Sequence, residues 1–204
     1  MLDETMLDRV RIEVSSRMSE RRYRHTLGVE AAVTVLGEQL CPERTLELRA
    51  AALLHDIAKE LPREEQTALL LELGLYTEEI PLAYELAHGY LAPYFIERDF
   101  PELASEDILL AVRYHTTGRA DMSTFEKILF LADYIEEGRT YADCALVREF
   151  FFSNVGKIKK ERLLDEAVLL VMDKTLGYLM KHGFYIALDT VLARNSVLRA
   201  LSHQ

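Results

Sequence analysis

Apolar residues recur along most of the chain at intervals of three and four positions, the spacing that places them on one face of a helix. In the first such segment these residues are Leu7, Val10, Ile12 and Val14. The pattern predicts helices over residues 3–17, 22–40, 44–61, 63–73, 80–96, 102–115, 125–137, 161–181 and 189–201. The segment 80–96 is compatible with one helix or with two short ones.

Helix breakers and capping residues agree with these boundaries. Pro62 ends the third segment, and Gly74, Gly118 and Gly138 stand where helix C-termini are expected. Ser123 and the threonine after it offer N-cap chemistry to 125–137. The sequence has no long alternation of apolar and polar residues and no Asn-Gly or Asp-Gly hairpin signal. We therefore expect an all-α fold in one domain, residues 1–204.

Composition and charge limit the classes of function that the chain can have. The 204 residues are 50% hydrophobic and 28% charged, which is ordinary for a folded globular protein. The formal net charge of -10 would repel nucleic acid and anionic lipid, so we expect neither as a partner. No apolar run reaches the roughly 18 residues of a membrane span, and the acidic N-terminus does not resemble a signal peptide. Cys41 and Cys144 form no CxxC pair, which favours free thiols in a cytoplasmic protein.

Four of the six histidines lie at or near predicted helix ends, beside apolar residues: His25, His55, His88 and His115. One histidine on an apolar face is usually a core residue with its hydrogen bonds satisfied, but four in similar positions make a shared site the better hypothesis. His25 follows three arginines, of which Arg21 and Arg22 share its helix face.

Two aspartates accompany these histidines. Asp56 directly follows His55 after the apolar stretch 50–54, where its carboxylate could bridge two cations while the imidazole binds one of them. Lys59 lies on the same face and suits either a helix salt bridge or a phosphate contact. Asp133 stands in an apolar helix, where an acid is costly without a cation or a hydrogen-bond donor. It is a candidate ligand or an ordinary salt-bridge residue.

The order of these histidines and aspartates resembles the HD-domain phosphohydrolases, in the variant that carries two metals. The resemblance narrows to the YqeK-type family, symmetrical diadenosine tetraphosphate hydrolases that release two ADP. The matching segments are RYRHTLGVEAA (22–32), LLHDIAK (53–59), AHG (87–89), YHTTGRADMSTFEKILFLADYIEEGR (114–139) and LARN (192–195). The resemblance implies an HD-domain helical bundle over about 20–140, with additional C-terminal helices over about 141–204. The chain departs from the family at Glu137, usually a proline, and after His88-Gly89, where it has Tyr90, Leu91 and Pro93.

The family implies a dinuclear centre and predicts a role for each matching residue. The expected metal ligands are His25, His55, Asp56, His88, His115 and Asp133. Iron is the implied metal, while mixed imidazole and carboxylate ligands also suit manganese, zinc or nickel. A hydroxide activated by the metals would attack phosphorus. Asp56, Lys59 and Arg139 are the candidate catalytic residues.

Several residues are candidate contacts to the substrate, a small dinucleoside polyphosphate or nucleotide. Lys59 and Arg139 suit phosphate oxygens, and Arg24 is a further candidate. Thr116 and Thr117 would offer donors, although a plain helix C-cap explains them equally well.

Three alternatives stay open at this stage. The chain could be another HD-domain nucleotide phosphohydrolase that acts on a dNTP or a nucleoside monophosphate. It could be a non-catalytic domain that binds metal or nucleotide, or a helical domain whose histidines are structural. The apolar residues of 163–201 fit either an ordinary core or the face of a homodimer.

Overall fold

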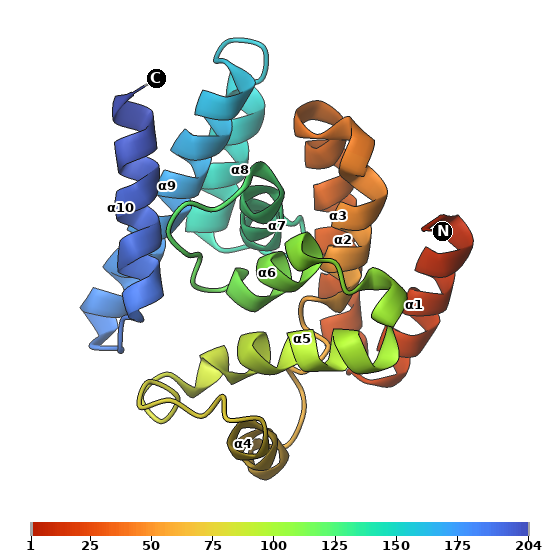
Figure 1. The fold of residues 1–204 in the computed structure, drawn as a ribbon. Coiled ribbons are helices and arrows are strands. Elements are labelled where there is room, and N and C mark those ends of the chain that lie inside the picture. Colours follow the sequence, from red (N-terminus) through yellow and green to blue (C-terminus); the bar gives the residue numbers. More distant parts are fainter. Residues whose placement is uncertain (1, 204) are drawn as a thin grey trace.

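The computed structural model describes residues 2–203, and it is built from helices (Figure 1). In this part of the chain the α-helices are α1 (Glu4–Ser16), α2 (Glu20–Leu40), α3 (Thr45–Leu54), α4 (Arg63–Glu72), α5 (Ala87–Asp99), α6 (Glu106–Tyr114), α7 (Thr124–Ile135), α8 (Ala142–Asn154), α9 (Lys160–His182) and α10 (Leu188–Ser202). Three 3-10 turns lie between them, η1 (Pro42–Arg44), η2 (Tyr84–Leu86) and η3 (Pro101–Leu103). The expectation of an all-α fold is confirmed.

Helix α7 is the central element of the packing. It contacts α2, α3, α6, α8 and α9, and most of its side chains are buried. Ser123 caps its first turn in a capping box: the Ser123 hydroxyl accepts from the Glu126 amide, and the Glu126 carboxylate accepts from the Ser123 amide. This arrangement satisfies free backbone donors at the start of a buried helix, as the sequence predicts at that position.

Three of the helices that position the candidate residues, α2, α3 and α6, pack against α7. Helices α2 and α3 pack side by side, α3 also contacts α6, and α5 lies against α6 (Figure 1). Gly89 allows α5 and α6 to come together, because a Cβ at Gly89 would lie 3.0 Å from the backbone oxygen of Arg113.

Several segments differ from the sequence-based expectation, among them the start of 102–115, where η3 (Pro101–Leu103) and a short loop precede α6. Helix α3 ends at Leu54 and gives way to turns over 55–60, where the backbone bonds run from Ile57 to Leu54 and from Lys59 to Asp56. The segment 80–86 forms turns and η2, so α5 begins only at Ala87. Helix α8 is an element that the pattern analysis did not predict, although its buried residues Cys144, Val147 and Phe151 follow helical spacing.

The C-terminal helices bury one part of their apolar surface and expose another. Buried side chains in the first half of α9 join the core, among them Leu164, Val168 and Met172. Tyr178, Phe184 and other apolar residues farther along are exposed. A homodimer through these exposed residues stays a prediction.

Among the described residues, no helix combines the length and the hydropathy that a membrane span requires.

Candidate metal centre

The two carboxylate oxygens of Asp56 face different pairs of histidines. Oδ2 lies 3.3 Å from His55 Nε2 and 3.8 Å from His25 Nε2. Oδ1 lies 3.3 Å from His88 Nε2 and 3.7 Å from His115 Nε2. A carboxylate between two sets of imidazole nitrogens has the arrangement of a ligand shared by two cations.

Asp133 completes one of these sets. Its Oδ1 atom lies 3.0 Å from His25 Nε2 and 4.0 Å from His55 Nε2. Two overlapping groups of side chains therefore have the geometry to hold a metal ion: His25, His55 and Asp133 form one, and His55, Asp56 and His115 form the other. All six residues expected as ligands lie in one place.

The local backbone explains how adjacent residues reach the same centre. Because α3 ends at Leu54, His55 and Asp56 lie on the turn that follows the helix. His88 comes from the first turn of α5, and His115 directly follows α6. Side chains at helix ends are free of the 100° separation that a continuous helix imposes on neighbours.

Three of the histidines are oriented through Nδ1. His55 Nδ1 lies 2.6 Å from the Ala52 carbonyl, His115 Nδ1 lies 2.7 Å from the Val112 carbonyl, and His25 Nδ1 lies 3.1 Å from Glu136 Oε1. Since a carbonyl only accepts, Nδ1 of His55 and of His115 donates to it, and this bond fixes each ring with Nε2 on the side of Asp56.

Buried polar atoms at the centre also fit a metal. Nε2 of His25 and Nε2 of His55 are buried and have no hydrogen-bond partner among the described residues. A buried nitrogen without a partner is costly unless something satisfies it. These atoms point at the carboxylates of Asp56 and Asp133, so the donor set suits divalent cations.

The charge states also suit ligands. Burial would raise the pKa of Asp56, but the interactions with His55 and His115 outweigh burial and hold that pKa well below its usual range. For Asp133, burial is likewise outweighed, chiefly by the positive charge of Arg139, and the pKa lies well below its usual range. Both acids are therefore ionised at neutral pH.

Buried His88 contacts half-buried Lys59 at the other end of the cluster. Lys59 Nζ lies 3.2 Å from His88 Nδ1 and 3.4 Å from the Glu85 carbonyl. Burial, followed by the charge of Lys59, holds the pKa of His88 well below its usual range, so this imidazole is neutral. Burial also lowers the pKa of Lys59, against the opposing effect of Asp56.

Two arginines pair with the two carboxylates. Arg22 Nη1 lies 2.6 Å from Asp56 Oδ2, and Arg139 Nη2 lies 2.6 Å from Asp133 Oδ1. No role for Arg22 was predicted from the sequence, although the helix face that it shares with His25 was a usable signal. The candidate Arg24 is exposed and pairs with Glu20 at 3.2 Å.

The two candidate threonines occupy different surroundings. Thr116 Oγ1 lies 3.1 Å from His115 Nε2 and 3.4 Å from His88 Nε2, so it borders the centre. Thr117 is buried, and its hydroxyl donates to the Gly118 carbonyl at 2.9 Å. Its hydroxyl is committed to the turn after α6.

Glu136 is a buried acid that the sequence analysis did not single out. One of its oxygens lies near His25 Nδ1, and the other accepts from the Gly138 amide at 2.6 Å. A Cβ at Gly28 would lie 2.4 Å from Glu136 Oε2, so the glycine lets the carboxylate reach α2. An acid in a Glu-Glu-Gly run resembles a surface turn, so nothing in the sequence marked Glu136 as a buried residue.

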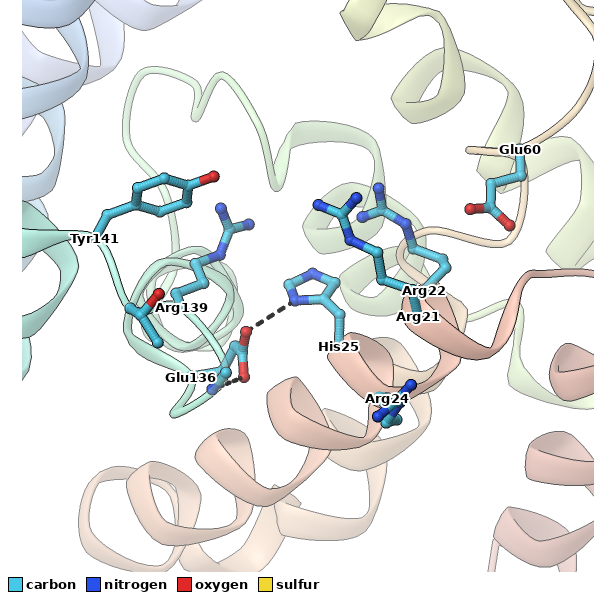
Figure 2. Close-up of a pocket in the computed structure, with 10 residues that line it drawn as sticks. Arg21, Arg22, Arg24, His25, Glu60, Glu136, Arg139 and Tyr141 are labelled. Carbon is cyan, nitrogen blue, oxygen red and sulfur yellow. Dashed lines mark hydrogen bonds and ion pairs between the residues drawn. The ribbon is translucent and has the colours of Figure 1, made fainter.

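A pocket of about 560 Å³ opens beside His25 (Figure 2). The start of α2 forms one side of it and the segment after α7 forms the other. Its lining residues are Arg21, Arg22, Arg24, His25, Glu60, Glu136, Gly138, Arg139, Thr140 and Tyr141.

Comparisons with known proteins agree with this geometry. The HD domain family matches residues 22–138. A Bacillus subtilis protein named symmetrical bis(5'-nucleosyl)-tetraphosphatase is 32% identical over 184 residues, which are 89% of this chain and 92% of that protein. A protein of the same name from Halalkalibacterium halodurans is 33% identical over 91% of this chain and 93% of its own length.

A solved structure has the same fold. It is the crystal structure of an HD superfamily hydrolase from Clostridium acetobutylicum, described as involved in NAD metabolism. It superposes with a TM-score of 0.82 at 30% identity and covers 95% of this chain and 97% of that one. The chain therefore belongs to the HD-domain hydrolases, and within them to the family of the proteins named symmetrical bis(5'-nucleosyl)-tetraphosphatase.

Proposed function

We propose that this hydrolase cuts diadenosine tetraphosphate symmetrically into two ADP at a centre of two divalent metal ions. The observation that carries the proposal is the position of Asp56, whose two oxygens each face a separate pair of histidine Nε2 atoms. The names of the two relatives that are 32% and 33% identical supply the substrate.

The proposed ligands are His25, His55, Asp56, His88, His115 and Asp133, with Asp56 as the bridge. Two such cations would supply a nucleophilic hydroxide near neutral pH and offset charge on the phosphoryl oxygens. Iron is the first candidate, and manganese, zinc and nickel suit the same donors. Two ionised carboxylates leave the loaded centre positively charged, so it can attract a polyphosphate to a protein of net charge -10.

The chain's own groups would bind and orient the phosphates. Lys59 presents a half-buried ammonium beside His88, and Arg139 presents a guanidinium beside Asp133. Thr116 places an exposed hydroxyl at the border of the centre. Substrate contacts from Arg24 and Thr117 stay predictions. Arg24 lines the pocket beside His25, and Thr117 lies in the turn next to Thr116. We place the enzyme in the cytoplasm, consistent with free thiols at Cys41 and Cys144.

Product analysis tests the reaction. Metal-loaded protein is incubated with diadenosine tetraphosphate, and the nucleotides formed are separated by chromatography. ADP as the sole product is the expected result, whereas AMP with ATP would exclude symmetrical cleavage. A dNTP and a nucleoside monophosphate, assayed in parallel, test the alternative of another HD-domain phosphohydrolase. Negligible hydrolysis of every nucleotide would favour a binding domain.

A further inference from the structure

In the part of the chain that the structure describes, the guanidinium of Arg148 on α8 hydrogen-bonds to backbone carbonyls of the segment after α7 and to no carboxylate. Nε donates to the Ile135 carbonyl at 2.6 Å, and Nη2 donates to the Glu136 and Arg139 carbonyls at 2.6 and 3.1 Å. We propose that Arg148 is a positioning residue of the hydrolase, which acts by holding the backbone of this segment in place. Two side chains depend on it: Glu136, which contacts His25, and Arg139, the candidate phosphate contact.

This inference deepens the proposed function, and it rests on that function for the metals and for the role of Arg139. Arg148 lies outside residues 22–138, the part of the chain that matches the HD domain family. Its guanidinium hydrogen-bonds to none of the six candidate ligands. Its effect on the reaction therefore passes through the segment that it holds.

The segment that Arg148 holds is the end of a helix. Ile135 is the last residue of α7, and the carbonyls of a last helical turn have no partner within the helix. The chain then turns, and the Arg139 amide donates back to the Glu136 carbonyl at 3.0 Å. Arg148 supplies charged donors here, whose hydrogen bonds are about twice as strong as neutral ones. Its charge also opposes the partial negative charge of the helix end.

The first side chain that depends on this segment is Glu136. One of its oxygens lies 3.1 Å from His25 Nδ1, and the other accepts from the Gly138 amide at 2.6 Å (Figure 2). The backbone of the same residue is held by Arg148 at 2.6 Å. A continuous series of hydrogen bonds therefore runs from α8 through Glu136 to an imidazole of the metal centre.

The second side chain is Arg139. Its Nη2 atom donates to Asp133 Oδ1 at 2.6 Å, while its buried Nε atom has no hydrogen-bond partner among the described residues. If Asp133 serves as a metal ligand, its oxygen shares its charge with a cation, and its bond to Arg139 weakens. The backbone of Arg139 then matters more for the direction of its guanidinium, and Arg148 holds that backbone through the carbonyl.

The competing account is that Arg148 is only a helix cap that stabilises the fold. A cap alone would lower Tm, and its loss would weaken the metal centre to the same extent whether or not Glu136 and Arg139 are present. A positioning residue behaves differently, because removing the group through which it acts also removes its effect. Double variants distinguish the two accounts.

Metal affinity tests the link through Glu136. Mn²⁺ is titrated into the metal-free wild type, Arg148→Met, Glu136→Ala and the double variant. Methionine keeps a long apolar side chain and removes the donors. Arg148→Met should lower Mn²⁺ affinity by about tenfold. In the Glu136→Ala background the same change should cost less than about twofold, because the link to His25 is already broken.

The rate of hydrolysis tests the link through Arg139. The value of kcat/KM for diadenosine tetraphosphate is measured at saturating Mn²⁺ for Arg148→Met, Arg139→Ala and the double variant. Arg148→Met should lower kcat/KM by about tenfold, since a displaced catalytic group loses much of its effect. In the Arg139→Ala background the further loss should be less than about twofold.

Arg162→Met provides the control. Arg162 is a half-buried arginine on α9 whose Nε atom pairs with Glu166 of its own helix at 2.8 Å. This variant should match the wild type in both measurements. Arg148→Lys keeps the charge without the planar fork, and it replaces Arg148→Met in both backgrounds if the methionine variant does not fold.

The outcomes separate the two links and the proposed function. Unchanged Mn²⁺ affinity and kcat/KM in Arg148→Met would overturn the inference. A full loss in either double variant would overturn the link that this variant tests and would leave Arg148 as a cap there. Failure to hydrolyse diadenosine tetraphosphate would refute the proposed function, whereas the Mn²⁺ titrations would still decide whether Arg148 acts on His25 through Glu136.

Discussion

At the scale of single residues, Glu136 links the fold to the metal centre. It is 4% exposed and lies against His25 Nδ1, whereas the next residue, Glu137, is exposed. Groups that hydrogen-bond to a ligating imidazole fix its orientation and raise its basicity. We predict that Glu136→Ala lowers metal affinity by about 10- to 100-fold, measured by titration of the metal-free protein.

Glu137→Ala is the matched control for this change, because it removes the same charge one position away. It should leave metal affinity unaltered. Equal losses in both variants would mean that the general negative charge of the segment, and not the contact with His25, supports the metals.

A second residue-scale prediction concerns pH. A hydrogen bond from Arg98 lowers the pKa of Asp99 from 3.8 to about 2. Burial opposes this shift to a smaller extent, and a second hydrogen bond, from Arg17, adds to it. Since the pKa is lower in the folded than in the unfolded state, Asp99 stabilises the fold above about pH 4, and this contribution is lost as the pH falls toward 2. Asp99→Asn should therefore lower the free energy of unfolding at pH 7 but bring it close to the wild-type value near pH 2. Denaturant titrations at both pH values measure the difference. A constant difference at both values would contradict the ion-pair account.

At the scale of helices, the regular spacing of apolar residues predicted most helices, whereas some helix ends differ from the prediction. Predicted segments such as 161–181 and 189–201 agree with α9 (Lys160–His182) and α10 (Leu188–Ser202) within a residue at each end. The helix predicted over 44–61 is longer than α3, because the apolar run through Ile57 continues past the point where α3 ends. That early end is a tertiary effect: His55 and Asp56 leave the helix to face groups on other helices. Spacing along one chain cannot show such partners.

The candidate site shows the same limit. Its six ligand candidates were readable because histidines and aspartates are unusual beside apolar residues. Arg22 and Glu136 were not, since arginine and glutamate in helix ends and turns are ordinary surface residues in sequence. Only the approach of α2 to the turn after α3 and to the end of α7 brings Arg22 to Asp56 and His25 to Glu136.

Gly89 offers a test at this scale. A Cβ there would lie 3.0 Å from a backbone oxygen of α6, so Gly89→Ala should push α5 and α6 apart. His88 Nε2 and His115 Nε2, 3.0 Å apart across that contact, would separate. We predict a lower Tm and weaker metal binding in this variant.

Gly177→Ala is the control for the same substitution in a helix. A Cβ at Gly177 would have no atom within 4 Å, and the residue is exposed in α9. Alanine there should stabilise the protein by about 0.5–1 kcal/mol, because it lowers the entropy of the unfolded chain. A loss of stability at both positions would argue that the effect at Gly89 is not a steric one.

At the scale of the whole molecule, the centre joins segments that are distant in sequence. Its proposed ligands lie on or directly beyond α2, α3, α5, α6 and α7, from His25 to Asp133. The HD-domain match over residues 22–138 covers all of them, and we propose that α8 to α10 form the additional C-terminal part. A metal that binds all these segments can bind only the folded chain, so its binding free energy adds to the stability of the fold.

We therefore predict that adding Mn²⁺ to metal-free protein raises Tm and that a chelator reverses the rise. At a concentration 100 times the dissociation constant, one site contributes about 2.7 kcal/mol to the free energy of unfolding.

A chain with a net charge of -10 also attracts cations to its surface, which could raise Tm without any specific site. Asp56→Asn separates the two effects, because it removes the charge of the proposed bridging ligand and leaves the acidic surface in place. The rise in Tm of the Asp56→Asn protein should be small. Asp173→Asn changes an exposed acid on α9, and the Tm of that variant should rise as much as that of the wild type. An equal rise in all three proteins would assign the stabilisation to the surface and remove the thermodynamic support for a metal centre at Asp56.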